Sequence, residues 1–171
     1  MELKNMDVGR VLRIRRNLTI PEVGPQSVEC CGKIYQKAQE IGASVSGPWH
    51  FVSHGLPKDI ETSYTVDFCL PVSDVSHQVN GDDIQLVTLN EFYCASSTFE
   101  GGLHQLFELG YQPLLNEINA VNGKYTGESR EVYHKWAGPE SVDNVVEIQF
   151  GLVAGRPHEC LVFQRLIKTS T

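Results

Sequence analysis

The chain lacks any long hydrophobic run, and this absence excludes one class of proteins at once. No stretch of its 171 residues approaches the roughly 20 apolar residues that a membrane-spanning helix needs. The first ten residues, MELKNMDVGR, have no apolar stretch behind their charges, so we expect no secretory signal peptide. Together these absences predict a cytoplasmic protein that does not insert into a membrane.

Cysteine is sparse and carries no pattern. The number is odd, two residues are adjacent and no C-x-x-C pair occurs among the five cysteines, Cys30, Cys31, Cys69, Cys94 and Cys160. This arrangement excludes a disulfide framework and a zinc motif, so we expect reduced, structural thiols. His50 and His54 lie on one strand face and His134 repeats His54, but no third ligand is in register, so no metal is expected.

Positive charge is the minority charge. The chain holds 14 Lys and Arg against 21 Asp and Glu, which gives a net charge of −7. A nucleic-acid partner requires a basic face, so no direct nucleic-acid binding is expected. No G-x-S-x-G, P-loop or dinucleotide-binding fingerprint is present, so no motif indicates a catalytic residue or a cofactor.

What the chain does contain is an internal repeat. Identical residues recur 80 positions later in the pairs Gly47 and Gly127, Val52 and Val132, His54 and His134, and Val66 and Val146. Apolar residues recur at the same spacing in Ile34 and Leu114 and in Leu70 and Phe150. The same spacing aligns Asp67 with Glu147. Two equivalent halves usually pack about a pseudo-twofold axis, and a cleft where such halves meet is a preferred ligand site.

Hydrophobic periodicity predicts the same element order in both halves, which span about 7–75 and 83–155. Each half is a strand, a helix and two further strands. In the first half these are residues 8–18, 27–41, 49–54 and 63–72, with Pro21, Gly24 and Pro25 breaking the backbone ahead of the helix. In the second half they are residues 84–95, 106–121, 131–136 and 145–153, with Gly110 and Pro113 inside the helical pattern.

Residues 161–167, within a segment of about 159–168, predict an extra strand that the repeat does not explain. Such a strand suits a sheet edge or a homodimer contact. The complete prediction is one α+β domain over residues 1–171, built from tandem strand-helix-strand-strand units with pseudo-twofold symmetry. Its antiparallel sheet carries two main helices that flank a central cleft.

Glu147 is an acid in the middle of an apolar strand, and its repeat mate Asp67 occupies the same place in the first half. Each acid faces either solvent or a pocket, and the repeat alone does not decide between these alternatives. Aromatic residues cluster around the same strands and on the second helix: Trp49, Phe51, Phe107, Tyr111, Tyr133 and Trp136. Such rings form a core or line a pocket, and they suit flat cationic ligands.

Several of these segments resemble a known family. The stretch Thr98-Phe-Glu-Gly-Gly, Tyr111 on a helix, Asn122-Gly123, Gly127, Glu131-Val132-Tyr133 and Glu147-Ile148-Gln149 is similar to the GyrI-like effector-binding domains. These are the ligand-sensing modules of AraC-type and MerR-type multidrug regulators. The first half fits through its helix, Gly47-Pro48 and Leu70-Pro71-Val72, so the resemblance covers about residues 7–155.

The resemblance implies a fold of two strand-helix-strand-strand units with a ligand cleft between the helices. It also implies that a glutamate on the last strand meets a lipophilic cation among aromatic rings. The matching residues here are Glu147 and Tyr133, and the candidate ligand site therefore comprises these two with Trp136, Tyr111, Phe107, Trp49, Phe51 and Asp67. Two positions depart from the family pattern at the rim: Glu128 follows Gly127, and Gly151 replaces the usual proline.

The function that follows is binding of lipophilic, aromatic organic cations by a free-standing module. Only about seven residues precede the first strand and about eighteen follow the repeat, so no helix-turn-helix domain is expected. An acid among rings is poorly solvated, which predicts a raised pKa for Glu147.

Two other functions stay open for the chain. One is hydrolysis of strained-ring compounds by Glu147 and Tyr133, although catalysis is not the favoured interpretation. The other is interaction with a protein, either DNA gyrase or a separate regulator.

Overall fold

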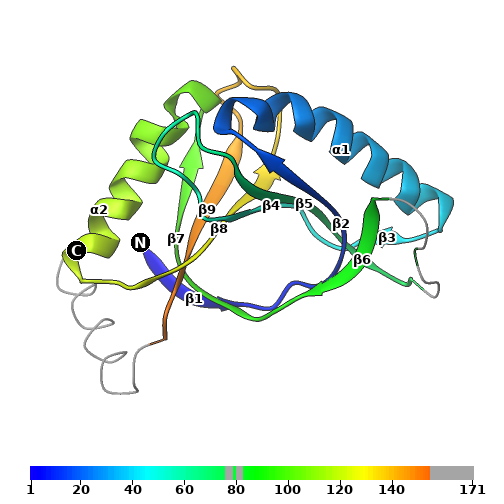
Figure 1. Cartoon of the computed structure of the whole chain (residues 1–171), viewed down its shortest axis with the longest axis horizontal. Helices are drawn as coiled ribbons and strands as arrows, with labels where there is room; N and C mark the ends of the chain where they lie inside the picture. The colour runs from blue at the N-terminus through cyan, green and yellow to red at the C-terminus, as the bar shows by residue number, and fades with distance from the viewer. Residues whose placement is uncertain (76–78, 80–82, 155–171) are drawn as a thin grey trace. The chain divides into compact units, whose positions relative to one another are not determined.

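The computed structural model describes residues 1–75, 79 and 83–154. The extra strand expected at residues 161–167 lies outside the described residues. The α+β class is confirmed, because helices accompany strands whose pairings are antiparallel (Figure 1). No helix among the described residues has the length and apolarity that crossing a membrane takes.

The strands are β1 (Glu2–Met6), β2 (Gly9–Leu18), β3 (Ser44–Val45), β4 (Trp49–His54), β5 (Tyr64–Ser73), β6 (Ile84–Leu89), β7 (Phe92–Glu100), β8 (Tyr125–Lys135) and β9 (Val145–Leu152). The helices are α1 (Ile20–Glu40) and α2 (Gln112–Ala120), and α2 follows a 3-10 turn (Leu103–Gln105) and a π-helix (Leu106–Tyr111). They divide into two compact units. Of the described residues, those within 7–91 and 128–132 form the N-unit, and residues 1–6, 92–127 and 133–154 form the C-unit.

The N-unit is a sheet in the order β4-β5-β2-β6, with β3 added beside β5 and α1 packed on one face. Its core lies between α1 and the sheet, where alternate residues of β2 and β5 meet the apolar side of the helix. Fully buried members of this core include Leu12, Ile14, Ile34 and Phe68. The next residues along each strand point to the opposite face, so Asp67 and Phe68 lie on different sides of the sheet.

Helix α1 begins seven residues earlier than the sequence pattern predicts. The expected break at residues 21–25 is wrong, because Thr19 and Glu22 form a capping box that starts the helix at Ile20. The Glu22 carboxylate accepts a hydrogen bond from the Thr19 backbone N–H at 2.8 Å. Pro21 then falls in the first turn, where its missing N–H is not needed, and Pro25 is carried inside the helix.

In the C-unit, β7 pairs with both β1 and β9. The helix predicted over residues 106–121 is present but irregular. Its first part is the π-helix, and Pro113 lies in the first turn of α2, where proline is tolerated. Gly110 is buried against β9, since a Cβ placed on it would lie 2.7 Å from Ile148 Cδ1. The glycine therefore lets the helix backbone approach the sheet closely.

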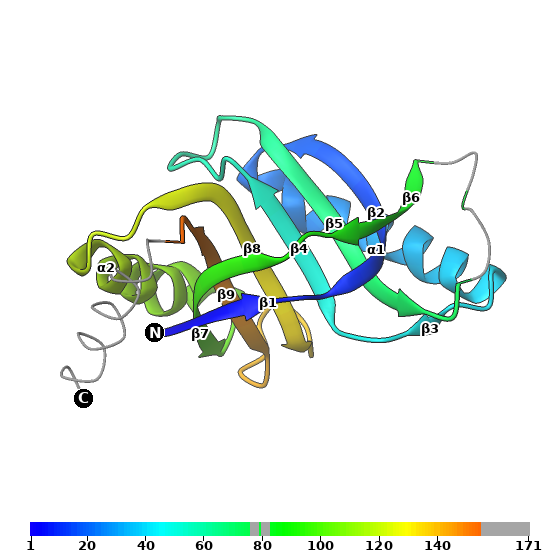
Figure 2. The same cartoon turned by 90° about the horizontal axis from the view of Figure 1, so that it is seen from below.

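The single strand predicted over residues 84–95 is wrong, because the structure has two strands there, β6 and β7, in different units. Strand β1 was not predicted. Strands β1 and β6 each join the unit of the other's neighbour in the chain. Strand β1 directly precedes β2 but pairs with β7, and β6 directly precedes β7 but pairs with β2 (Figure 2). The two pairings correspond residue by residue, since Met6 lies opposite Phe92 just as Leu89 lies opposite Gly9.

Candidate functional site

Glu147 lies in the middle of β9, on the sheet face that turns away from α2. Alternation along the strand sets this direction. Ile148 and Phe150 face the helix, as shown by the proximity of Ile148 to Gly110 and by the ring contact between Phe150 and Tyr111. Glu147 and Gln149 therefore share the other face, and they contact each other there.

Three side chains hold the Glu147 carboxylate. The Lys4 ammonium on β1 is 2.9 Å from Oε2, and His134 Nε2 on β8 is 3.1 Å from Oε1. The amide of Gln149 donates a hydrogen bond to Oε2. We call Lys4, His134, Glu147 and Gln149 the Glu147 cluster. Glu147 is 7% exposed, whereas the Lys4 side chain is 25% exposed and the His134 side chain is 44% exposed. Lys4 and His134 are therefore more accessible to solvent than the carboxylate that they contact.

Gln149 contributes an unused acceptor to this cluster. Its side chain is completely buried, and its Oε1 has no hydrogen-bond partner among the described residues. A buried acceptor without a partner loses the hydrogen bonds that water would supply, which costs about 1–3 kcal/mol. The Glu147 cluster therefore contains a negative charge and an amide oxygen without a hydrogen-bond partner among the described residues.

The pKa of Glu147 is lowered, which contradicts the expectation from the sequence. Burial alone would raise the pKa of this carboxyl, but the hydrogen bonds from Gln149, Lys4 and His134 together outweigh burial. On Lys4, burial acts to lower the pKa, but the contact with Glu147 raises it overall. Glu147 is therefore a carboxylate at neutral pH, and no proton must leave before a cation binds.

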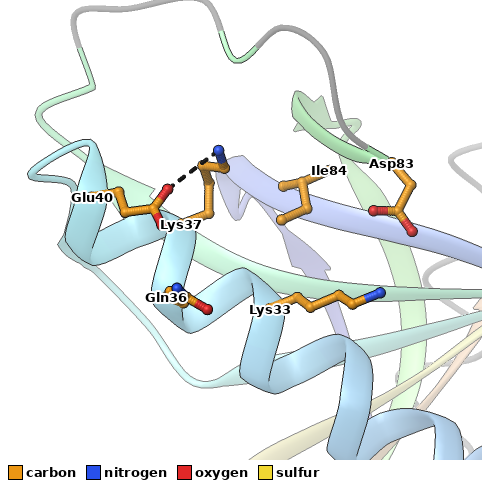
Figure 3. A pocket seen from close by; sticks show the side chains of 6 residues that line it. All are labelled: Lys33, Gln36, Lys37, Glu40, Asp83 and Ile84. Atoms are coloured by element: carbon orange, nitrogen blue, oxygen red, sulfur yellow. Dashed lines mark ion pairs between the residues drawn. The ribbon is translucent and has the colours of Figure 1, made fainter.

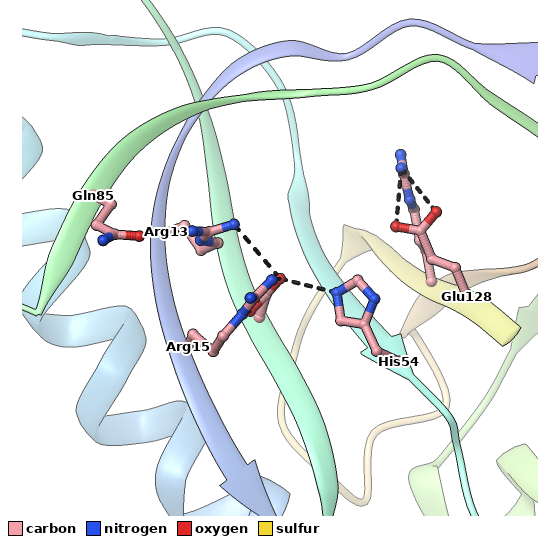
Figure 4. A network of polar contacts seen from close by, with 7 residues as sticks. Arg13, Arg15, His54, Gln85 and Glu128 are labelled. Carbon is pink, nitrogen blue, oxygen red and sulfur yellow. Dashed lines mark hydrogen bonds and ion pairs between the residues drawn. The ribbon is translucent and has the colours of Figure 1, made fainter.

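The acid of the N-unit is held differently. Asp67 is 2% exposed and accepts two parallel hydrogen bonds from the Arg15 guanidinium, from Nε at 2.7 Å and from Nη2 at 2.8 Å. His54 Nε2 lies 3.0 Å from the same carboxylate and Arg13 Nη1 lies 3.9 Å away (Figure 4). Burial raises the pKa of Asp67, but the contacts with Arg15, His54 and Arg13 bring it below its usual value.

The two acids are nonetheless equivalent in their histidine partners. His54 contacts Asp67, and His134 contacts Glu147, with the same separation of 13 residues along the chain. The sequence repeat had aligned these four residues without indicating that they pair. It gave no signal for Lys4 or Arg15, because both partners come from strands whose pairing is set by the fold.

The predicted aromatic residues do not surround Glu147. Tyr111 and Tyr125 both contact Phe150, at ring-centroid distances of 5.8 Å, on the face that carries α2. Phe107 is 65% exposed on the π-helix. Because neighbours on a strand point to opposite faces, Tyr133 lies on the other side of β8 from His134. The acid and these rings are therefore on different faces of the C-unit strands.

The remaining predicted rings have other surroundings. Tyr133 contacts Trp136 at 5.8 Å, and Trp136 is half exposed just beyond the end of β8. In the N-unit, Trp49 and Phe51 pack against the core under α1, where Phe51 meets Phe68 edge to face at 4.9 Å. That core lies on the face opposite Asp67. Ligand binding by the predicted site residues, and the cleft expected between the helices, stay predictions.

A polar hollow of about 290 Å³ lies elsewhere, between α1 and the start of β6 (Figure 3). It is lined by Lys33, Gln36, Lys37, Glu40, Asp83 and Ile84. Over the part of the chain that the structure describes, no group of three or more His, Cys, Asp or Glu side chains is arranged to hold a metal. Burial raises the pKa of the Cys31 thiol to about 12, so that cysteine is not a ready nucleophile.

Known structures share this architecture. EcmrR, in a cryo-EM structure of its complex with DNA, matches with a TM-score of 0.73 and 19% identity over 90% of this chain and 57% of that chain. This chain thus spans just over half the length of that EcmrR chain. The EcmrR C-terminal domain alone matches with a TM-score of 0.67 and 18% identity, over 90% of this chain and 97% of the domain. The chain has the fold of the EcmrR C-terminal domain.

SAV2435, in its structure bound to tetraphenylphosphonium, matches with a TM-score of 0.54 and 11% identity over 90% of this chain and 95% of that chain. No family model and no curated protein matches the sequence. The fold implied by the family resemblance is confirmed by the match to the EcmrR C-terminal domain, while these identities leave ligand and activity to be argued from the site.

Proposed function

We propose that this protein binds lipophilic organic cations, with the Glu147 carboxylate as the counter-charge to the ligand. The observation that carries the proposal is the state of this acid. It is buried, ionised and paired with the ammonium of a single flexible lysine. A carboxylate held in this way can exchange one cation for another.

Lys4 is suited to give way to a ligand. Its side chain is one-quarter exposed, and its contact with Glu147 is a single ion pair at the end of a four-carbon stem. An ammonium that leaves this pair regains full hydration. A large cation with a delocalised or shielded charge is cheaper to dehydrate than a small ammonium, so the exchange favours lipophilic cations.

Asp67 does not offer the same opportunity. Its carboxylate is already held by a guanidinium fork and by His54, and Arg13 adds a second positive charge nearby. A cationic ligand would have to displace a two-point contact there. The charge balance around the two acids therefore favours Glu147 as the binding residue.

The likeness to SAV2435 supports the ligand class. That protein has been solved with tetraphenylphosphonium bound, and tetraphenylphosphonium is a lipophilic aromatic cation. In the C-unit, the half-exposed Trp136 lies two residues after His134 in the sequence and offers a ring for such a ligand. We propose that Trp136 supplies aromatic contact while Glu147 supplies charge.

Calorimetric titration of the full chain with tetraphenylphosphonium tests the proposal, with triphenylphosphine oxide as a neutral control of similar shape. We expect a micromolar-class dissociation constant for the cation and no measurable binding of the neutral compound. Saturation with the cation at a hundred times the dissociation constant should add about 2.7 kcal/mol to the free energy of unfolding. Equal binding of both compounds would show that Glu147 does not select charge, and the proposal would be wrong.

A further inference from the structure

The position beside each acid on the neighbouring strand differs between the two units. In the N-unit, the pairing of β2 with β5 places Arg15 directly opposite Asp67. In the C-unit, the pairing of β7 with β9 places Thr98 directly opposite Glu147. Since the strands correspond in the two units, Arg15 and Thr98 are equivalent positions with different chemistry.

The N-unit supplies the cation for its own acid. The planar guanidinium of Arg15 presents two N–H groups to the two oxygens of Asp67, at 2.7 and 2.8 Å. This fork matches a carboxylate better than any other side chain can. The N-unit therefore shows which cation geometry this strand arrangement accommodates above an acid.

The C-unit keeps the acid but has no guanidinium at the equivalent position. Thr98 is short, uncharged and exposed to solvent. The charge of Glu147 is met instead by Lys4, which comes from the next strand, where it pairs with Cys94. The lysine ammonium is a point charge that contacts Oε2, so the planar fork that Arg15 presents in the N-unit is not reproduced.

Gln149 adds a specific demand for a hydrogen-bond donor. Its amide nitrogen bonds to Glu147 Oε2, the same oxygen that Lys4 contacts. Its buried, unpartnered Oε1 belongs to the same amide group as that nitrogen. A cation that replaces Lys4 and also satisfies this oxygen needs an N–H group beyond those that bond the carboxylate.

We infer that the ligand of the Glu147 cluster is a planar cation with N–H donors, an amidine or a guanidine carrying an aromatic group. The inference rests on the proposed function and names the ligand class for the same site. The ligand takes the place that Arg15 fills in the N-unit: two N–H groups bond the Glu147 carboxylate, and a third reaches Gln149 Oε1. His134 keeps its contact, because a carboxylate has about four lone-pair sites and these bonds fill them.

Three aromatic compounds test this inference by calorimetric titration of the full chain. Benzamidine is a planar cation with N–H donors, benzyltrimethylammonium is a cation without them, and benzamide is a neutral isostere of benzamidine. We expect benzamidine to bind about tenfold or more tightly than benzyltrimethylammonium, the effect of one hydrogen bond to a charged group. Benzamide should bind more weakly than both cations.

A substitution tests whether a side chain of the protein can occupy the ligand's place. Thr98→Arg places a guanidinium opposite Glu147 as Arg15 lies opposite Asp67, so benzamidine affinity should fall about tenfold or more. Asn90→Arg adds the same charge at an exposed loop position outside the C-unit and should leave that affinity unchanged. Circular dichroism confirms that both variants fold.

The outcomes separate the two proposals. Equal binding of benzamidine and benzyltrimethylammonium would overturn the inferred ligand class while cation binding at Glu147 stands. Unchanged benzamidine affinity in a folded Thr98→Arg variant would overturn the inferred position of the ligand. Failure of both these cations and tetraphenylphosphonium to bind would overturn the proposed function itself.

Discussion

Neutralising each acid in turn should separate stability from binding. Asp67→Asn removes the two hydrogen bonds from Arg15 and the contact with His54 in a site that is 2% exposed. Hydrogen bonds to charged groups are worth about 1.5–3 kcal/mol each. Because the Arg15 side chain is 52% exposed, solvent screens part of this energy and rehydrates the freed guanidinium. We expect a loss of about 2–3 kcal/mol in the free energy of unfolding.

Compared with Asp67→Asn, Glu147→Gln should lower the free energy of unfolding less and weaken binding of the ligand cation more. The Lys4 ammonium is one-quarter exposed and returns to water when its partner is removed, so we expect a loss of about 1–2 kcal/mol. Loss of a partly buried charge partner for a ligand cation costs about 2–5 kcal/mol, which is a fall in affinity of roughly thirtyfold or more. Asp67→Asn should leave that affinity within about twofold, because Arg15 already occupies the acid in the native protein.

The assay combines urea unfolding with calorimetric titration of tetraphenylphosphonium on both variants. We expect the two variants to rank in opposite order in the two assays. Asp67→Asn should be the less stable protein, and Glu147→Gln should bind tetraphenylphosphonium more weakly. If Asp67→Asn weakened tetraphenylphosphonium binding as much as Glu147→Gln, the assignment of the ligand charge to the C-unit would be refuted. Full affinity in Glu147→Gln would refute the role of the carboxylate altogether.

Two further measurements check the electrostatics and the packing. Both acids have a lowered pKa in the folded protein, so their stabilising contribution is complete above the unfolded values near pH 4 and is lost as the pH falls through the folded values. The melting temperature should therefore drop below about pH 4, and tetraphenylphosphonium affinity should stay flat from about pH 5 to 8; a rise in affinity across that range would show that Glu147 binds a proton there. Gly110→Ala should destabilise by about 1–2 kcal/mol, because its Cβ would lie 2.7 Å from Ile148 Cδ1, whereas Gly32→Ala in α1, with no atom within 4 Å, should be neutral or stabilising by up to about 1 kcal/mol. Thermal unfolding of the pair checks this, and equal shifts would contradict the close approach of the π-helix to β9.

Much of the fold could be predicted because the repeat and the apolar periodicity are local signals. Strand β4 has the predicted bounds, and β2, β5 and β9 agree within one residue at either end. The start of α1 was misplaced because a capping box at Thr19 overrode two prolines. The exchange of β1 and β6 could not be predicted, because strand pairing is a long-range choice and the polar segment at β1 carries little apolar alternation.

The candidate site was predicted in part. The repeat identified Glu147 and Asp67 as equivalent acids, but their different counter-ions depend on the strands beside them. The position of the rings could have been inferred from alternation, since Glu147 and Gln149 alternate with Ile148 and Phe150 along one strand. A helix that covers the apolar residues of β9 cannot also bring its own rings to the acid.

The exchanged strands have a consequence for the origin of the molecule. Each sequence repeat encodes an edge strand that completes the sheet of the other compact unit, since β1 is paired with β7 and β6 with β2. A protein made of one such repeat would leave one strand without a partner and one sheet edge open, which is a template for association. Two identical copies could close both edges by trading their first strands. The topology of the present chain is thus that of a strand-swapped homodimer whose two subunits are joined into one polypeptide, and in a joined chain the residues opposite the two acids, Arg15 and Thr98, are free to differ.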